Sequence, residues 1–155
     1  MPGQPLESVI APGAALLIDS SVVLAYLAGG EPGSERAGEL FDSMVATGRN
    51  PAWISAVTVQ EILVRPFQRG AAAIATAEGF LGHFSGLRVI DVGFEVAREA
   101  ARIRAATTLR TPDALILASA SISRADIFVT DDERLRVAAG RIAPHLTVAV
   151  LREIG

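Results

Sequence analysis

The chain has 155 residues, half of them hydrophobic, and a formal net charge of −3 at pH 7. This length fits one domain with a sizeable core, and the composition excludes a disordered chain. The absence of cysteine excludes disulfide bonds, thiolate zinc sites and a cysteine nucleophile. Acidic residues (17) outnumber basic ones (14), so the overall charge gives no indication of nucleic-acid binding.

The N-terminal segment and the hydropathy pattern bear on location. No stretch approaches the roughly 18 consecutive apolar residues of a membrane-spanning helix. The first dozen residues contain several prolines and no basic residue, unlike a signal peptide. We therefore expect a cytoplasmic protein with no membrane segment. We treat residues 1–155 as a single domain in which residues 1–13 form a loose arm.

In the first half of the chain, short apolar runs predict strands, and the stretches between them predict helices. The expected elements are a strand at 14–18, a helix at 20–28, a helix at 34–47, a strand at 51–54, a helix from 56, and an alanine-rich helix that ends near 83. We expect the helix from 56 to end or kink at Arg65-Pro66, because a proline ring clashes with the preceding turn.

The second half continues the same alternation. The expected elements are a strand at 87–91, a helix at 94–107, a helix at 111–121, a strand at 127–130, a short helix at 131–139 and a strand at 147–151. Thr111-Pro112-Asp113 is typical of a helix start, with threonine as the cap. Strands that alternate with helices predict an α/β fold, with a mostly parallel central sheet of four to five strands flanked by helices.

Acidic residues occur where this fold would bring them to one edge of the sheet. Asp19 directly follows the first predicted strand, and Asp131 and Asp132 follow the fourth. Asp113 opens a helix that is apolar nearly all round, and Glu61 lies within a helix among apolar residues. Ligands of open α/β sheets bind at the carboxyl ends of the strands. We therefore expect these carboxylates to meet there.

Each acid also has a purely structural interpretation. Asp19 fits a helix cap, as does one of the two aspartates after the fourth strand. Asp113 fits the stabilisation of a helix dipole, worth ~0.3–1 kcal/mol. Glu61 fits a surface pair with Arg65, worth ~0.3–0.5 kcal/mol. Only the repetition of the pattern favours a joint site.

The joint interpretation makes a chemical prediction. Carboxylates ~5 Å apart repel by about 3 kcal/mol per pair at an effective dielectric constant of 20. A protein gathers them only around a cation or with raised pKa values. A carboxylate site without cysteine or histidine suits Mg²⁺ or Mn²⁺.

Four motifs, in this order, resemble those of PIN-domain ribonucleases, and more narrowly those of the VapC-type toxins of VapBC toxin–antitoxin pairs. They are LLIDSSVVLAYL, ISAVTVQEIL, RTPDALILASA and IFVTDDERL, and the resemblance covers about residues 15–151. It implies a PIN-like three-layer fold. It also implies a Mg²⁺-dependent endoribonuclease, with Mn²⁺ able to substitute, that acts as the toxin of a type II pair.

The resemblance also implies roles for particular residues. Asp19, Asp113 and Asp132 match the metal ligands, and Glu61 would hold a second metal ion or orient the attacking water. The last acid of the family follows a threonine and one intervening residue, which favours Asp132 and leaves Asp131 as its substitute. The positions that would hydrogen-bond the ligands are Ser21, Thr58 and Thr130.

Partners are implied in the same way. Proteins of this kind cleave RNA, form dimers, and are inhibited by a small VapB-type antitoxin, for which an arginine reaching into the carboxylates is the expected device. The candidate contacts to RNA phosphate are Arg98, Arg102, Arg104 and Arg110. Alternatively, these arginines form a solvated helix face paired with Glu95 and Glu99.

Two other function classes compete with this interpretation, a non-catalytic binding module and an Asp-based phosphatase or phosphoacceptor domain. A non-catalytic PIN-like module that binds RNA or protein would typically lack one or more of the acids, and all of them are present here. An Asp-based phosphatase of the haloacid-dehalogenase kind needs a second acid two residues after Asp19, where this chain has Ser21. A receiver domain needs a lysine, and the chain contains none.

Overall fold

The computed structural model describes residues 4–30 and 33–154. A five-stranded parallel sheet with the order β3-β2-β1-β4-β5 forms its centre. The strands are β1 (Leu16–Ile18), β2 (Ala52–Ser55), β3 (Leu87–Ile90), β4 (Ile127–Thr130) and β5 (Thr147–Val150). The predicted α/β class and all the predicted strands are confirmed.

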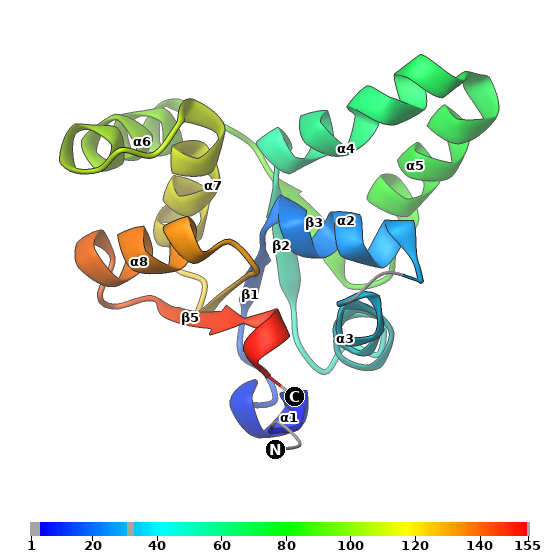
Figure 1. Ribbon diagram of the computed structural model, residues 1–155, viewed down its shortest axis with the longest axis horizontal. Helices are drawn as coiled ribbons and strands as arrows, with labels where there is room; N and C mark the ends of the chain where they lie inside the picture. Colours follow the sequence, from blue (N-terminus) through cyan, green and yellow to red (C-terminus); the bar gives the residue numbers. More distant parts are fainter. Residues whose placement is uncertain (1–3, 31–32, 155) are drawn as a thin grey trace.

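Helices cover both faces of this sheet (Figure 1). On one side lie α2 (Ser20–Ala28), α3 (Ser34–Gly38), its π-helical continuation η1 (Glu39–Val45), α4 (Ala56–Arg69) and α5 (Ala71–His83). On the other side lie α6 (Phe94–Ala106), α7 (Thr111–Ile122) and α8 (Glu133–Ile142). The short elements α1 (Leu6–Val9) and η2 (Leu151–Glu153) lie near the two termini. No helix in the described ranges is long and apolar enough to cross a membrane.

Alternating side chains of the central strands build two separate cores. In β1, Leu16 and Ile18 pack into the core beneath α2 and η1, whereas Leu17 packs into the core beneath α6 and α7. In β4, Val129 and Phe128 divide in the same way. Burial on both faces explains why these strands are continuous apolar runs.

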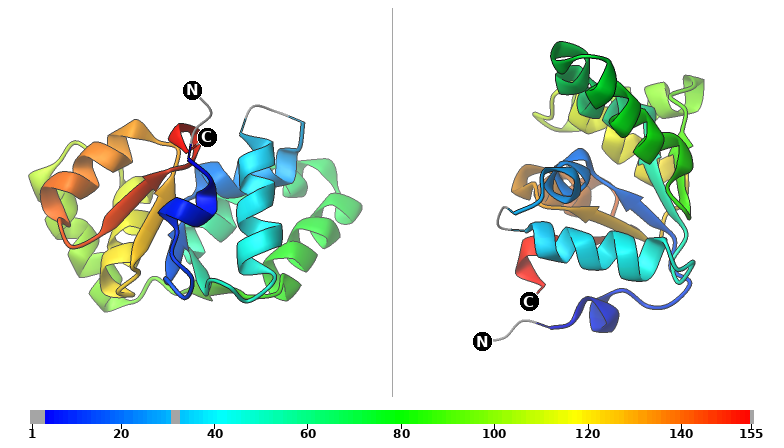
Figure 2. Two further views of the ribbon diagram at one scale, coloured as in Figure 1. Left: turned by 90° about the horizontal axis from the view of Figure 1, so that it is seen from below. Right: turned by 90° about the vertical axis from the view of Figure 1, so that its right-hand side faces the viewer.

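The N-terminal segment is less loose than predicted. Leu6 and Ile10 are fully buried in the first core. The amide of the buried Asn50 donates to the carbonyl oxygens of Ala11 and Ala14, at 2.8 and 3.0 Å. This side chain therefore ties the segment to the loop before β2. Figure 2 shows the N-terminal segment, in dark blue, beside the helical stretch of α3 and η1, in cyan. The first three residues of the predicted arm lie outside the described residues.

Two predictions about helix ends differ from the structure. The helix that begins at Ala56 does not end at Arg65 but runs through Pro66 to Arg69. Proline removes one backbone donor, but helical hydrogen bonding continues beyond it, where the Gly70 N–H donates to the Pro66 carbonyl at 3.0 Å. Thr111 does not cap α7 but is its first residue, with Arg110 in the cap position and no side-chain cap bond.

The order in which the chain adds strands to the sheet reverses at β1. From β1 the chain proceeds to β2 and β3 on one side, and then crosses to β4 and β5 on the other. The carboxyl ends of β1 and β4 therefore form the topological switch point, where open α/β sheets bind ligands. Asp19 and Thr130 lie at this point, and the Asp19 N–H donates to the Val129 carbonyl at 2.9 Å.

Candidate active site

Asp19 lies at the switch point with its side chain only 4% exposed. Its Oδ2 accepts hydrogen bonds from Ser21 Oγ at 2.7 Å and from Thr130 Oγ1 at 2.8 Å. The residue stands in the N-cap position of α2, but its side chain makes no capping hydrogen bond. The capping interpretation therefore does not account for this carboxylate.

Both hydroxyl groups are oriented by the turn after β4. The Asp131 N–H donates to Ser21 Oγ at 3.2 Å, and the Asp132 N–H donates to Thr130 Oγ1 at 3.0 Å. A hydroxyl has a single proton. Because each oxygen already accepts from an amide, its own proton is directed at Asp19. This arrangement favours the carboxylate form of Asp19.

The charge on Asp19 is nevertheless poorly compensated. Burial raises the pKa of Asp19 above its ordinary value, and the hydrogen bonds from Ser21 and Thr130 oppose that shift. Across residues 4–30 and 33–154, no arginine or histidine forms an ion pair with Asp19. A buried carboxylate held only by neutral donors is a favourable ligand for a cation.

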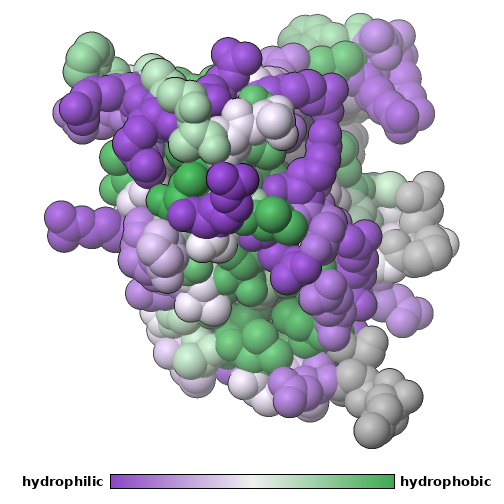
Figure 3. Space-filling view, turned by 60° about the vertical axis from the view of Figure 1, so that its left-hand side comes forward, coloured by the Kyte–Doolittle hydropathy of each residue, from purple (hydrophilic) through white to green (hydrophobic). Residues whose placement is uncertain are grey.

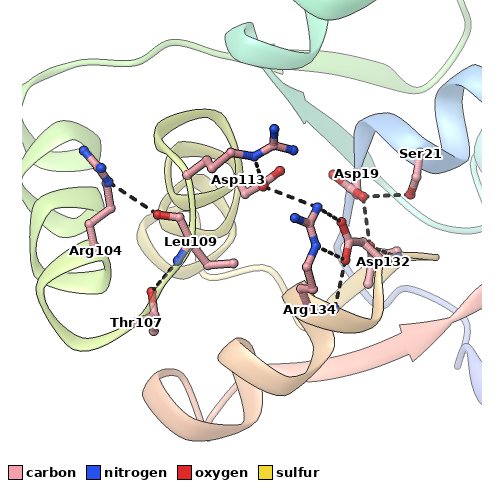
Figure 4. A network of polar contacts seen from close by, with 10 residues as sticks. Asp19, Ser21, Arg104, Thr107, Leu109, Asp113, Asp132 and Arg134 are labelled. Carbon is pink, nitrogen blue, oxygen red and sulfur yellow. Dashed lines mark hydrogen bonds and ion pairs between the residues drawn. The ribbon is translucent and has the colours of Figure 1, made fainter.

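Asp132 and Asp113 lie beside it, joined by an arginine (Figure 4). Arg134 Nη2 is 2.9 Å from Asp132 Oδ2 and 3.8 Å from Asp113 Oδ2. The Asp113 and Asp132 side chains are 16% and 24% exposed, whereas that of Arg134 is 60% exposed. Polar contacts thus run without a break from Asp19 through Thr130, Asp132 and Arg134 to Asp113.

The two aspartates after β4 have different surroundings. Asp132 Oδ1 accepts from the Arg134 N–H at 2.8 Å, so Asp132 caps α8 and also faces Asp113. The hydrogen bonds from Arg134 hold the pKa of Asp132 below its ordinary value. Asp131 Oδ1 instead accepts from the Arg152 N–H at 2.7 Å. One of the two aspartates therefore caps the helix, as the sequence suggests, and the same residue faces Asp113.

The acids do not converge directly in this structure. In the described part of the chain, no three side chains from His, Cys, Asp and Glu lie close enough together to hold a metal ion. The guanidinium of Arg134 lies between Asp113 and Asp132 instead (Figure 4). Hydrogen bonds and this arginine, rather than shared ligation, therefore link the three aspartates.

Glu61 lies apart from this network, on α4. It makes no hydrogen bond or ion pair with another described residue, so the alternative interpretation, a surface pair with Arg65, does not hold. Glu61 and Ser21 line an open groove of about 910 Å³ between α2, α4 and α5. Thr58, expected to hydrogen-bond a ligand, is buried and pairs with Ser20 Oγ at 2.9 Å.

Of the candidate RNA-contacting arginines, three lie on α6, and only Arg110 lies near the acids. Arg102 pairs with Glu99 at 2.6 Å, as the solvated-face interpretation expects, and Arg98 is exposed on the same helix. Arg104 Nε donates to the Leu109 carbonyl at 3.4 Å. Arg110 Nε lies 3.9 Å from Asp113 Oδ2 and is therefore nearest to the acids.

A second hollow adjoins the acids on the side of α6 and α8. It measures about 620 Å³ and is lined by the loop after α6 and by one face of α8, including Arg134, Val137 and Arg141. Figure 3 shows this side of the molecule, where hydrophilic side chains project and hydrophobic surface lies between them. Arg134 thus borders both the acidic network and this cleft.

Arg134 is the one site residue to which the sequence analysis gave no role. A signal for it exists: it lies in the first turn of α8, where the helix dipole disfavours a cation. A basic residue there needs a nearby anion, and IFVTDDERL supplies one.

Comparison with known proteins places this geometry in a family. The PIN-domain model matches residues 16–141. The chain belongs to the PIN-domain family. This match spans the switch point, all the acids discussed above and both hollows of the PIN domain. The comparison with curated proteins found no relative.

Solved structures share the fold at low sequence identity. VapBC2 of Rickettsia felis, bound to a DNA fragment from its promoter, has a TM-score of 0.64 and 16% identity, over 87% of this chain and 97% of that chain. A toxin–antitoxin complex from Klebsiella pneumoniae has a TM-score of 0.64 and 20% identity, over 85% and 95%. VapC20 of Mycobacterium tuberculosis, a toxin that cleaves the sarcin-ricin loop, has a TM-score of 0.64 and 17% identity, over 79% and 94%.

Proposed function

We propose that this PIN-domain protein is a metal-dependent endoribonuclease that acts as the VapC-type toxin of a type II toxin–antitoxin pair. The observation that carries the proposal is the unbroken polar network that joins Asp19, Asp132 and Asp113 at the topological switch point. PIN nucleases generally use a divalent metal ion. The structures with the same fold include toxins and their complexes.

The residues at this point fit a hard divalent cation. The donor set consists of carboxylates and hydroxyls, which suit Mg²⁺ and Mn²⁺. The positively charged Arg134 guanidinium occupies the place between Asp113 and Asp132 that a metal ion would take. Asp19, Asp113 and Asp132 would hold the metal, and Asp131 is directed away from them. When bound, Mg²⁺ lowers the pKa of a coordinated water and stabilises negative charge at the phosphate.

The chain's own residues supply the orientation. Ser21 and Thr130 fix Asp19 through hydrogen bonds whose direction is set by the main chain. Glu61, at the groove side of the site, would accept a proton from the attacking water or hold a second metal ion. RNA phosphates would lie along the cleft beside α8, with Arg110 and Arg141 as contacts.

A VapB-type antitoxin and a homodimer are part of the same proposal. The groove beside Glu61 has exposed apolar side chains at its rim, with Leu24 44%, Leu27 39% and Val64 43% exposed. An antitoxin segment over this groove would cover these side chains and close access to the acids from the α4 side. Sedimentation of the antitoxin-free protein tests the dimer, for which a monomer at all concentrations would be the contrary result.

The test of activity uses purified, antitoxin-free protein and a mixed pool of transfer RNA and ribosomal RNA. Cleavage should require Mg²⁺ or Mn²⁺ and be absent in EDTA and in Asp19→Ala. Asp91→Asn is a matched control, because Asp91 is an exposed acid directly after β3 that takes no part in the network. Undiminished cleavage by Asp19→Ala would overturn the proposal. Metal-independent RNA binding without cleavage would favour the non-catalytic module instead.

A further inference from the structure

Arg134 occupies an unusual position for a cation. It lies two residues after the cap of α8, at the positive end of that helix. Its guanidinium bends back over the cap: Nε is 3.3 Å from Asp132 Oδ1, and Nη2 is 2.9 Å from Asp132 Oδ2. The same Nη2 approaches Asp113 Oδ2 at 3.8 Å. The two carboxylates therefore offset the unfavourable helix-dipole interaction.

Exposure indicates which partner can move. Asp113 and Asp132 are fixed at the start of α7 and α8, and their side chains are 16% and 24% exposed. The Arg134 side chain is 60% exposed and borders the open cleft beside α8. The arginine can therefore turn into solvent and leave the two carboxylates free to bind another cation. An ion pair with so exposed a cation is weak, so the arginine can be displaced.

We propose that Arg134 is an intramolecular counter-cation, which neutralises the Asp113–Asp132 pair in the metal-free protein and is displaced when a divalent cation binds there. This inference rests on the proposed function, because it takes the pair to be part of the metal site. It assigns the chain's own arginine to the place for which an antitoxin arginine was expected.

The consequence is competition between two cations for one pair of anions. The apparent affinity for a divalent cation equals the intrinsic affinity multiplied by the fraction of molecules in which Arg134 has left the acid pair. Removing the guanidinium should raise this affinity, because it removes the competing positive charge from the site. A residue needed only to shape the site would have the opposite effect on affinity.

The first test is titration of the purified protein with Mn²⁺, followed by electron paramagnetic resonance. Arg134→Gln should bind Mn²⁺ about three- to fivefold more tightly than the wild type, given the strength of an exposed pair. Arg136→Gln is the matched control, because Arg136 lies on the same helix and pairs with Glu133. It removes the same charge without opening the acid pair, and should leave the affinity within about twofold.

The second test observes the arginine directly in the wild-type protein. On titration with diamagnetic Mg²⁺, the Nε–Hε nuclear magnetic resonance signal of Arg134 should shift and saturate with Mg²⁺ binding, while that of Arg136 stays in place. This readout requires no variant and no cleavage.

The outcomes separate this inference from the proposed function. If the wild type binds Mn²⁺ and Arg134→Gln binds it equally or less tightly, the counter-cation is overturned and the ribonuclease proposal stands. If neither protein binds Mn²⁺, both are overturned. Tighter binding by Arg134→Gln, with an unmoved Arg136→Gln, supports both.

Discussion

The two halves of the candidate site carry the same kind of group in opposite surroundings. Asp19 is buried and held by neutral hydroxyls, which fix its position but leave its charge poorly compensated. Asp113 and Asp132 are more exposed and share a charged partner, Arg134, that can leave. The buried half therefore sets the geometry of the site, and the exposed half sets its charge. Each half can be changed separately.

The largest effect is expected from Asp19→Asn, which keeps the shape and removes the buried charge. Cleavage should fall by more than about a hundredfold, because loss of even an outer partner costs 10–100-fold. In the metal-free protein the same change should raise the free energy of unfolding, by about 1 kcal/mol. Activity and calorimetry measure the two effects, and a less stable variant would contradict the account of Asp19.

The pH dependence of stability should differ between the halves. The raised pKa of Asp19 means that the metal-free protein gains stability as the pH falls through that folded pKa. The lowered pKa of Asp132 has the opposite sign: its contribution is present at neutral pH and is lost as the pH falls through the folded value. Asp19→Asn should abolish the first trend and Asp132→Asn the second, as denaturant unfolding at a series of pH values would measure.

Next in size is Thr130→Val, which removes the hydroxyl that joins Asp19 to the turn after β4. Metal affinity and kcat/KM should fall about 10–100-fold, and stability by about 1–3 kcal/mol. Thr58→Val is the matched control, because Thr58 is equally buried but pairs with Ser20. It should lose stability only. Equal losses of metal affinity in both variants would show that Thr130 has no special role.

A smaller effect concerns the cap of α8. Asp132→Ala removes both the capping oxygen and the partner of Arg134, and should destabilise the metal-free protein by about 1 kcal/mol. Asp132→Asn keeps the cap, so it should cost only a few tenths of a kcal/mol for the lost exposed ion pair. Thermal unfolding measures the difference, and equal losses would contradict a capping role for Asp132.

The smallest effect is expected in the cleft beside α8. Arg141→Gln should weaken RNA binding by an inactive variant and lower the salt dependence of that binding by about one phosphate contact. Arg102→Gln should change it less, because Arg102 is already paired with Glu99. Equal salt dependence of RNA binding for Arg141→Gln and the wild type would show that RNA does not bind in this cleft.

Much of the fold could be predicted because its central strands, β1 and β4, are buried on both faces. Residues 127–130 were predicted with the observed bounds, since burial in two cores favours an apolar run such as residues 127–129. The place of Asp19 followed from the same rule, as the first polar residue after such a run. Packing against other elements could not be predicted in this way. It buries Leu6 and Ile10 in the first core.

Contacts within the site were harder to predict than positions. The sequence predicts that Asp132 lies in the turn after the fourth strand. Only the structure shows that it both caps α8 and faces Asp113 through Arg134. Thr58 was expected to hydrogen-bond a metal ligand, but its hydroxyl pairs with that of Ser20 instead. Such choices depend on side-chain rotamers, which spacing along a helix does not determine.

The most direct test of the central claim is a crystal structure of the protein soaked in Mn²⁺, with the metal located by its anomalous scattering. The account predicts a peak bounded by carboxylate oxygens of Asp19, Asp113 and Asp132, with the Arg134 guanidinium turned away from the pair. A peak elsewhere, or a bound metal with Arg134 still between Asp113 and Asp132, would contradict it.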